Sequence, residues 1–256
     1  MKFTKMQGIG NDYIYVDGFR EHVKDPSALS IRMSDRHFGV GADGLILVLP
    51  SKCADFRMRM FNADGSEAEM CGNGARCVGR FVYDHGLTDK TSFTLETGGG
   101  IRPITLHLEA GRVQSVTVDM GAPQALEKRE GYVYVSMGNP HAVHLVPFDP
   151  FAWEAFEREG ARLCSTLGMN IEFTKVLSRE ALQMRVYERG SAETLACGSG
   201  ACASAAAAMA LGLCNQSVTV KLRGGTLLIE CRQEDGHILL RGDAVSVYEG
   251  DWLLGE

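Results

Sequence analysis

Short runs of alternating or continuous apolar residues, bounded by glycine, recur along the chain and predict β-strands. They span 14–16, 44–49, 56–61, 92–95 and 104–108 in the first half, and 132–136, 142–146, 183–187, 218–222, 226–231 and 237–240 in the second. Helical spacing of apolar residues predicts helices over 74–84 and 201–213, and shorter ones at 26–35 and 151–164. The helix at 201–213 is apolar on nearly all sides, so we expect it to form the core of its domain. The pattern indicates a mixed α/β (α+β) protein with antiparallel-rich sheets.

The segment Met58–Ala75 is repeated 126 residues later as Met184–Ala201, with seven of eighteen positions identical and no gap. A second match, Gly10-Asn11-Asp12 with Gly138-Asn139-Pro140, falls at nearly the same offset. Two matches at nearly the same offset predict two homologous, pseudo-symmetric domains. We place them at 1–122 and 123–256, with part of the C-terminal strands able to cross back to the first.

Composition and charge narrow the class of protein. The 256 residues are 45% hydrophobic and 23% charged, with a net charge of −6 and no block of like charge. A basic surface for nucleic acid or an anionic membrane is therefore not expected. The N-terminus lacks the apolar segment of a signal peptide, and the most apolar stretch, Ala201–Cys214, is shorter than the ~20 residues of a membrane span.

Eight cysteines in a chain without an export signal are expected to be reduced thiols in the cytoplasm. Neither their spacing nor that of the histidines matches a metal site. Most of them are expected to pack as small hydrophobic residues, and Cys77 and Cys202 are assigned to this role.

Two cysteines stand apart because each precedes a glycine-rich helix start, in E-M-C-G-N-G-A at Cys71 and L-A-C-G-S-G-A at Cys197. The amides and dipole of a helix N-terminus stabilise an anion, which here is a thiolate or a substrate carboxylate, and they lower a cysteine pKa. Packing is the alternative for either cysteine taken alone. Duplication instead predicts two such sites opposed across a closing cleft. One thiolate could then take a proton from one face of a carbon while the other thiol returns a proton to the opposite face.

Five motifs, spread over nearly the whole chain, resemble the diaminopimelate epimerase family. They are M-x-G-x-G-N-D at Met6–Asp12, G-x-G-A-D-G at Gly39–Gly44, F-N-A-D-G-S-x-x-E-M-C-G-N-G-A-R-C at Phe61–Cys77, G-N-P-H at Gly138–His141, and Y-E-R-G with A-C-G-S-G-A-C within Tyr187–Cys202. The resemblance implies two pseudo-symmetric domains, each a mixed sheet around a central helix. It also implies cofactor-independent epimerisation of L,L- to meso-diaminopimelate by catalytic thiols at Cys71 and Cys197, in lysine and peptidoglycan biosynthesis. It makes a homodimer an expectation, although no heptad or apolar patch requires one.

The resemblance also implies a polar set that binds the substrate, a diamino diacid with two ammonium and two carboxylate groups. The set comprises Asn11, Asn62, Asn139, Asn170, Glu188 and Arg189, with the backbone amides of Gly72, Asn73, Gly198 and Ser199 on the reacting α-carboxylate. Such a ligand needs both donors and acceptors. Arg189 suits a carboxylate, Glu188 suits an ammonium group, and His141 is expected to steer Cys71 toward its thiolate.

Three positions depart from the family pattern, so the sequence does not fix which chemical group the site binds at the distal end of the substrate. Gly44 stands where many relatives have glutamine, Ala192 replaces a glycine of G-x-G-E-T, and Ser199 stands where threonine is frequent. The alternatives are a histidine racemase, a proline or hydroxyproline epimerase, which Glu188-Arg189 disfavours, and a non-catalytic thiol protein that binds amino acids or senses redox state.

Four charged residues receive purely structural assignments. Glu67 and Glu193 are expected to cap turns, and Arg76 and Arg80 are expected on solvated helix faces.

Overall fold

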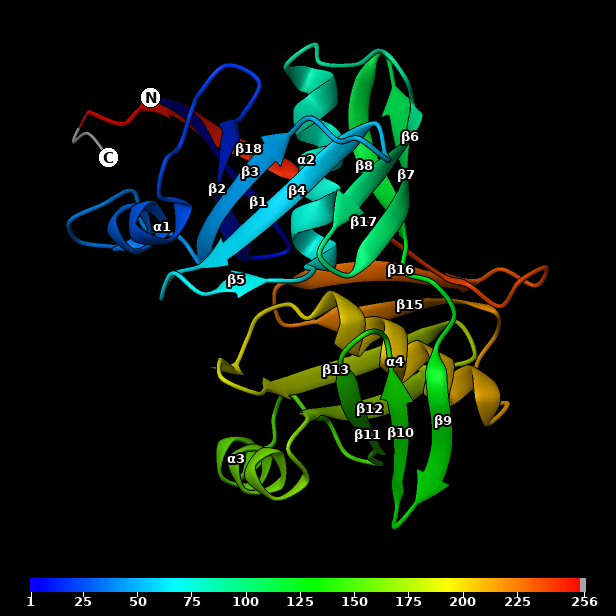
Figure 1. Ribbon diagram of the computed structural model, residues 1–256. Coiled ribbons are helices and arrows are strands. Elements are labelled where there is room, and N and C mark those ends of the chain that lie inside the picture. The colour runs from blue at the N-terminus through cyan, green and yellow to red at the C-terminus, as the bar shows by residue number, and fades with distance from the viewer. Residues whose placement is uncertain (254–256) are drawn as a thin grey trace. The chain divides into compact units, whose positions relative to one another are not determined.

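The computed structural model describes residues 1–253, and the chain divides into two compact units (Figure 1). Unit 1 comprises Met1–Val118 and the C-terminal segment from Asp243, and unit 2 comprises Asp119–Gly242. The chain therefore passes from unit 1 to unit 2 after Val118 and returns after Gly242. The predicted mixed α/β class is confirmed.

One mixed sheet and two helices build unit 1. Its strands, in chain order, are β1 (Lys2–Gly8), β2 (Asn11–Asp17), β3 (Gly44–Leu49), β4 (Phe56–Asn62), β5 (Glu67–Ala68), β6 (Ser92–Thr97), β7 (Gly100–Glu109), β8 (Arg112–Asp119) and β18 (Val245–Asp251), and its helices are α1 (Pro26–Ser34) and α2 (Gly72–Asp84). The spatial order is β18-β1-β2-β3-β4-β6-β7-β8, antiparallel except for the parallel pairs β2–β3 and β4–β6.

Unit 2 repeats this topology. Its strands are β9 (Gln124–Arg129), β10 (Tyr132–Ser136), β11 (Pro140–Leu145), β12 (Asn170–Ser178), β13 (Ala181–Glu188), β14 (Ala192–Glu193), β15 (Ser217–Leu222), β16 (Gly225–Cys231) and β17 (Ile238–Gly242), and its helices are α3 (Phe156–Leu167) and α4 (Gly198–Ala210). The order is β9-β10-β11-β12-β13-β15-β16-β17, with parallel pairs β11–β12 and β13–β15. The same two parallel steps recur at the same places, so the repeat predicted from the sequence is confirmed.

The central helix of each unit is packed among the strands. In unit 1, α2 contacts β1, β2, β7 and β18, and it buries Ala75, Val78, Phe81 and Val82. In unit 2, α4 contacts strands from β10 to β17 and is buried along most of its length. Its residues are mostly alanine, which has high helix propensity and lets strands approach from every side. The prediction that this apolar helix is the core of its domain is confirmed.

In strand order, one repeat runs from β1 to β9 and the other from β10 to β18. The last strand of each repeat belongs to the other unit. After β8 the chain enters unit 2, where β9 pairs with β10. After β17 it returns to unit 1, where β18 pairs with β1 along six register positions. The two repeats therefore exchange equivalent edge strands.

Several elements differ from the prediction. The helix expected at 151–164 begins at Phe156, because the carbonyls of Pro150 and Trp153 accept hydrogen bonds from Arg185 Nη1 (3.2 and 3.1 Å) in a turn before it. Seven strands were not predicted: β1, β5, β8, β9, β12, β14 and β18. Most of them mix charged with apolar residues or are only two residues long, so periodicity gives little signal.

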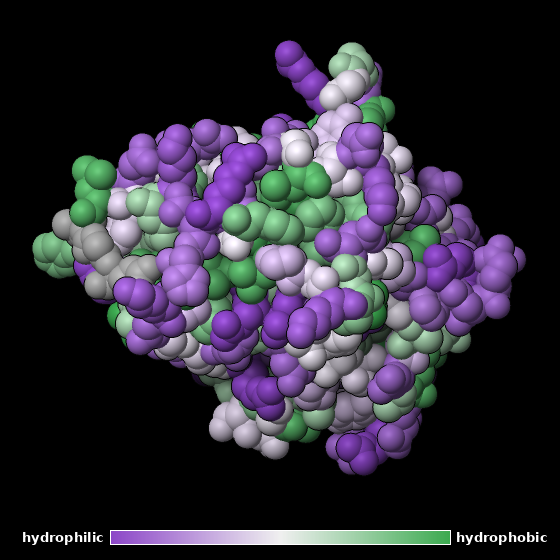
Figure 2. Space-filling view, turned by 45° about the horizontal axis from the view of Figure 1, so that its top comes forward, coloured by the Kyte–Doolittle hydropathy of each residue, from purple (hydrophilic) through white to green (hydrophobic). Residues whose placement is uncertain are grey.

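Hydrophilic side chains cover much of the face in Figure 2, with smaller hydrophobic areas between them. Within residues 1–253, no helix is both long and apolar enough to cross a membrane.

Candidate active site

Cys71 is the N-cap residue of α2. Its backbone is extended (φ −137°, ψ 118°), and its Sγ accepts a hydrogen bond from the Gly74 amide at 3.3 Å. A thiol in this position satisfies a helix amide that has no intrahelical partner. The Cys71 side chain is half-buried, and it therefore remains open to a small reactant.

An asparagine pair surrounds the Cys71 thiol. The thiol donates to Asn11 Oδ1 at 3.3 Å, and Asn73 Nδ2 donates to the same oxygen at 3.3 Å. Asn11 Nδ2 in turn donates to Asp43 Oδ2 at 2.8 Å, which fixes the orientation of the amide. The structure thus brings together the predicted residues Cys71, Asn11 and Asn73. Asp43, which belongs to the G-A-D-G motif, is an orienting residue that the sequence reasoning did not select.

Arg76 corrects an expectation: it is entirely buried, not solvated. Its Nη1 donates to Asn73 Oδ1 at 3.0 Å and its Nε to the Asp243 carbonyl at 3.1 Å, while Nη2 has no hydrogen-bond partner within the described chain. Burial lowers the pKa of this guanidinium, and its electrostatic interactions with Cys77 and then with Cys71 oppose the shift. A buried cation in the first turns of α2 favours the thiolate form of Cys71.

Cys197 is the N-cap residue of α4 and repeats the local geometry of Cys71. Its backbone is extended (φ −122°, ψ 106°), and its Sγ accepts from the Gly200 amide at 3.4 Å. Ser199 Oγ lies 3.6 Å from the sulfur. The surroundings differ, since Cys197 is buried and lies near two acidic residues. Burial, followed by the charges of Glu188 and Glu172, holds the pKa of its thiol well above the usual range.

A buried histidine–carboxylate pair lies in unit 2. His141 Nδ1 is 2.6 Å from Glu172 Oε1, and His141 Nε2 is 3.0 Å from Asn139 Oδ1. Both side chains are fully buried. Glu172 Oε1 also lies 2.8 Å from where a Cβ on Gly200 would stand, which places the carboxylate against the first turn of α4. His141 is therefore held in the unit that contains Cys197, by contacts with Asn139 and Glu172.

Glu172 was missed because its strand, β12, was not predicted: polar and charged residues interrupt the apolar positions between Ile171 and Val176. An acid between the apolar residues Ile171 and Phe173 was the signal that could have found it.

The remaining predicted residues of unit 2 lie at the start of β12, which is Asn170, and at the end of β13, which are Glu188 and the next residue, Arg189. Glu188 accepts a short hydrogen bond from the Thr194 hydroxyl, and burial raises the pKa of its carboxyl. Asn170 is buried, and its Oδ1 accepts from the Arg189 backbone amide at 2.9 Å. The Arg189 side chain is exposed, with Nη1 3.4 Å from the Gly168 carbonyl.

Asn62 lies at the end of β4 and holds the turn that follows. Its Nδ2 donates to Ser66 Oγ at 2.9 Å. Its register partner is Gly44, where a Cβ would stand 2.0 Å from the Phe61 carbonyl oxygen. That distance excludes any side chain, glutamine included, from position 44 in this backbone.

Ala192 has a positive φ of 58°, a conformation that favours the glycine of the family pattern.

The helix amides of Gly72, Asn73, Gly198 and Ser199 occupy the first turns of α2 and α4. These positions suit a carboxylate, because helix N-termini attract anions.

Cys77 and Cys202 are fully buried, and burial raises the pKa of the Cys77 thiol to about 11. The assignment of both to packing is confirmed. Within the described residues, no group of three or more His, Cys, Asp and Glu side chains is placed to hold a metal ion.

Comparison with known proteins gives one consistent result. The model of the diaminopimelate epimerase family matches residues 3–126 and 133–247. A diaminopimelate epimerase of Methanococcus maripaludis is 47% identical over 98% of this chain and 99% of its own length. Another, from Agathobacter rectalis, is 48% identical over 98% and 99%.

Solved structures share the fold at much lower identity. A hydroxyproline epimerase from Agrobacterium vitis has a TM-score of 0.77 at 15% identity, and covers 100% of this chain and 93% of its own. A phenazine biosynthesis protein from Bacillus anthracis has a TM-score of 0.74 at 19% identity, with 99% of both chains covered.

Two topologically identical units, each with a cysteine capping its central helix, define this chain as having the fold shared by these epimerases and phenazine biosynthesis proteins. The match to the family model and to full-length relatives is more specific. The chain belongs to the diaminopimelate epimerase family.

Proposed function

We propose that this protein epimerises L,L-diaminopimelate to meso-diaminopimelate without a cofactor, with Cys71 and Cys197 acting on one α-carbon. The observation that carries the proposal is the pair of cysteines that cap equivalent helices in opposite electrostatic surroundings. Cys71 lies near the buried Arg76, and Cys197 lies beside the acids Glu172 and Glu188. The family and the names of the full-length relatives support the substrate.

In the proposed reaction the Cys71 thiolate takes the α-proton of the substrate, and the electron pair of the C–H bond passes into the α-carboxylate. The Cys197 thiol donates its proton to the opposite face of the carbon, so the configuration inverts and the charge moves to the second sulfur. The helix amides at Gly72, Asn73, Gly198 and Ser199 stabilise the negative charge on the carboxylate. In the reverse direction the two sulfurs exchange roles.

A helix terminus contributes ~0.3–2 kcal/mol and an aimed oxyanion donor ~3–4 kcal/mol, against the ~8–23 kcal/mol by which enzymes lower barriers. Exclusion of water from the reacting atoms is therefore part of the proposal.

For the distal end of the substrate, the proposal assigns Arg189 to the carboxylate and Glu188 to an ammonium group. Arg189 is exposed, which leaves its guanidinium available to a ligand. The asparagines Asn11, Asn62, Asn139 and Asn170 would supply the remaining donors and acceptors. On family grounds we place the protein in the cytoplasm, as a homodimer, in lysine and peptidoglycan biosynthesis.

Proton NMR in D₂O on the reduced protein, without added cofactor, tests the proposal. L,L-diaminopimelate, L-histidine and L-proline are offered separately, and we expect loss of the α-proton signal and growth of the meso isomer with the first alone. Exchange with histidine alone would overturn the substrate, and no exchange in any tube, with both thiols titrated as free, would overturn the enzymatic function.

The cysteine variants test the two-thiol scheme. Cys71→Ala and Cys197→Ala are each expected to abolish epimerisation with circular dichroism unchanged. Cys77→Ala and Cys202→Ala are the matched controls, and they should lose stability but little turnover. Near-normal turnover in either of the first two variants would contradict the scheme.

A further inference from the structure

An arginine–glutamate pair recurs in both units. In unit 1, Arg59 donates from Nε and Nη2 to the two carboxylate oxygens of Glu67 at 2.7 and 2.8 Å. In unit 2, Arg185 and Glu193, each 126 residues further on, form the same two bonds at 2.7 and 2.8 Å. Glu67 and Glu193, expected to cap turns, instead pair with arginine, and the two pairs are equivalent.

The unit 2 pair has a third member. Arg223 Nη1 donates to Glu193 Oε1 at 2.7 Å, so this oxygen accepts from two guanidinium groups. The equivalent position in unit 1 is Gly98, because it follows β6 as Arg223 follows β15. The next amides also make equivalent bonds, Gly99 N to the Glu69 carbonyl at 3.1 Å and Gly224 N to the Leu195 carbonyl at 2.9 Å. Unit 1 therefore lacks the second guanidinium.

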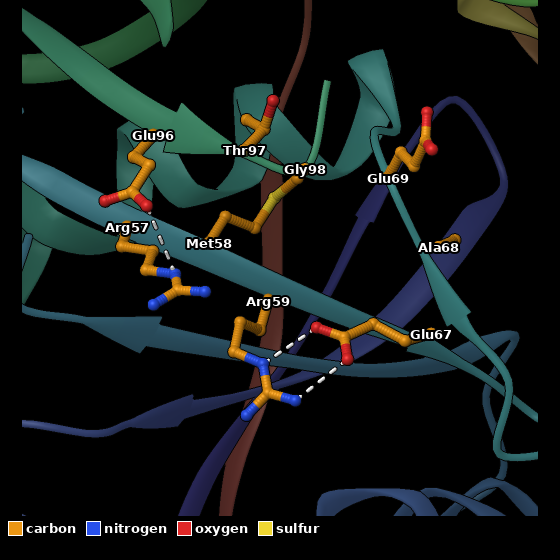
Figure 3. A pocket seen from close by; sticks show the side chains of 9 residues that line it. All are labelled: Arg57, Met58, Arg59, Glu67, Ala68, Glu69, Glu96, Thr97 and Gly98. Atoms are coloured by element: carbon orange, nitrogen blue, oxygen red, sulfur yellow. Dashed lines mark hydrogen bonds and ion pairs between the residues drawn. The ribbon is translucent and has the colours of Figure 1, made fainter. Parts of the chain in front are cut away.

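A pocket of about 260 Å³ is lined by Gly98, the position equivalent to Arg223, and by Glu67. Figure 3 shows the Arg59–Glu67 pair on one side of it, and Glu69 and Gly98 on the other. The side chain of Glu67 is 47% exposed, whereas that of Glu193, covered by Arg223, is 15% exposed. The Glu67 carboxylate is therefore more exposed than its counterpart, with Arg59 as its hydrogen-bonded partner and Arg57 as a further nearby charge.

The charges that line the pocket favour a cation. Three acidic residues, Glu67, Glu69 and Glu96, and two arginines, Arg57 and Arg59, line the pocket. Arg57 is 3.5 Å from Glu96, and Arg59 is bound to Glu67, so both lining cations already have acidic partners. One negative charge remains in excess, and a single added cation neutralises it.

We propose that this pocket of unit 1 binds the guanidinium group of an external ligand, in the position that Arg223 fills for Glu193. A guanidinium is preferred to a simple ammonium because its planar fork can share Glu67 Oε1 with Arg59 and reach a second carboxylate. The ligand is thus a small molecule or a polypeptide that presents an arginine-like side chain. All the residues that form the pocket lie in unit 1.

Isothermal titration of the full-length protein with agmatine, Nα-acetyl-L-arginine amide, free L-arginine and L-citrulline tests the proposal. We expect the three guanidinium compounds to bind at one site and citrulline, their uncharged analogue, to bind at least about tenfold more weakly. Equal binding of agmatine and of the acetylated amide supports recognition of the guanidinium alone. Binding restricted to free L-arginine supports a guanidinium site that also reads the amino-acid group. Equal affinity for citrulline would overturn the proposal.

Two variants locate the site. Glu67→Gln removes the accepting charge while keeping the shape, and it is expected to weaken agmatine binding about tenfold. Glu234→Gln makes the same charge change at an exposed position in unit 2 and should leave binding unchanged. Circular dichroism checks that both variants fold, and Glu96→Gln repeats the test at a second carboxylate. Unchanged binding in both Glu67→Gln and Glu96→Gln would overturn the site. Binding that persists in Cys71→Ala separates it from the proposed catalytic centre.

Discussion

The imidazole of His141 and the carboxylate of Glu172 form a fully buried pair, with Nδ1 and Oε1 2.6 Å apart. The second carboxylate oxygen, Oε2, has no hydrogen-bond partner among the described residues. This arrangement leaves part of a negative charge uncompensated beside the first turn of α4. It is one of the reasons why the thiol of Cys197 keeps its proton.

Replacing Glu172 by glutamine should make Cys197 more reactive. The variant removes a negative charge that raises the pKa of Cys197, so the pKa falls and the thiolate fraction at a given alkaline pH rises. We expect alkylation of Cys197 by iodoacetamide to accelerate severalfold at pH 9, measured by mass spectrometry of the peptide that contains it. Glu180→Gln, an exposed change in the same unit, is the control. An unchanged alkylation rate would show that Glu172 does not act on the thiol.

The two cysteines should differ in reactivity in the free protein. Cys71 is half-buried near a cation, while Cys197 is buried with a raised pKa. Because the thiolate is the reacting species, iodoacetamide at pH 7.5 is expected to label Cys71 at least about tenfold faster than Cys197, with Cys197 labelling increasing only as the pH rises. Peptide mapping over time at several pH values measures both rates. Equal labelling rates at pH 7.5 would contradict the expected difference in reactivity between Cys71 and Cys197.

Arg76→Met should slow the proposed reaction by lowering the thiolate fraction of Cys71. The substitution removes the buried cation and its hydrogen bond to Asn73, and it replaces the arginine side chain with a long apolar one. We expect kcat to fall roughly tenfold or more, and alkylation of Cys71 to shift to higher pH. Arg80→Met, one helical turn later and paired with Asp84, is the matched control and should leave both unchanged. A stability loss without a shift in the alkylation profile would indicate a packing role alone.

Ala192→Gly should stabilise the protein. Ala192 has a φ of 58°, where a Cβ is crowded and glycine is not. The relief exceeds the entropy that glycine gains in the unfolded chain, and we expect roughly 0.5–1 kcal/mol of added unfolding free energy in urea. Ala181→Gly, in β13 outside the left-handed region, should destabilise instead. A loss of stability in Ala192→Gly would show that the backbone at Ala192 is not strained.

The repeat was the most informative feature of the sequence. Offset 126 relates Cys71 to Cys197 and Gly72 to Gly198, and the structure starts a thirteen-residue helix at both glycines. Family motifs indicated the asparagines near Cys71, two of which, Asn11 and Asn73, lie in one hydrogen-bonded group with it. Local pattern and short-range capping chemistry were enough for these predictions.

What the sequence could not indicate depends on contacts between distant segments. Strands β1 and β18 pair although they lie at opposite ends of the chain, with Lys2 opposite Asp251, and their charged residues hide the apolar period. Arg76 is charged and lies on a helix, so local rules place it in solvent. One of its two hydrogen-bond acceptors, the backbone carbonyl of Asp243, lies far along the chain and gives no local signal. Glu172 likewise is paired by His141, thirty-one residues earlier.

The exchange of β9 and β18 describes a history as well as a fold. If two separate copies of one repeat each placed their last strand in the sheet of the other copy, they would form a domain-swapped dimer. Joining the end of one copy to the start of the other gives the connectivity of this chain. Either repeat cut out alone would leave β1 or β10 without its neighbour, and an unpaired edge strand invites aggregation. In the present chain a covalent connection keeps each exchanged strand in place, and the two helix starts differ, one near a cation and the other beside a pair of acids.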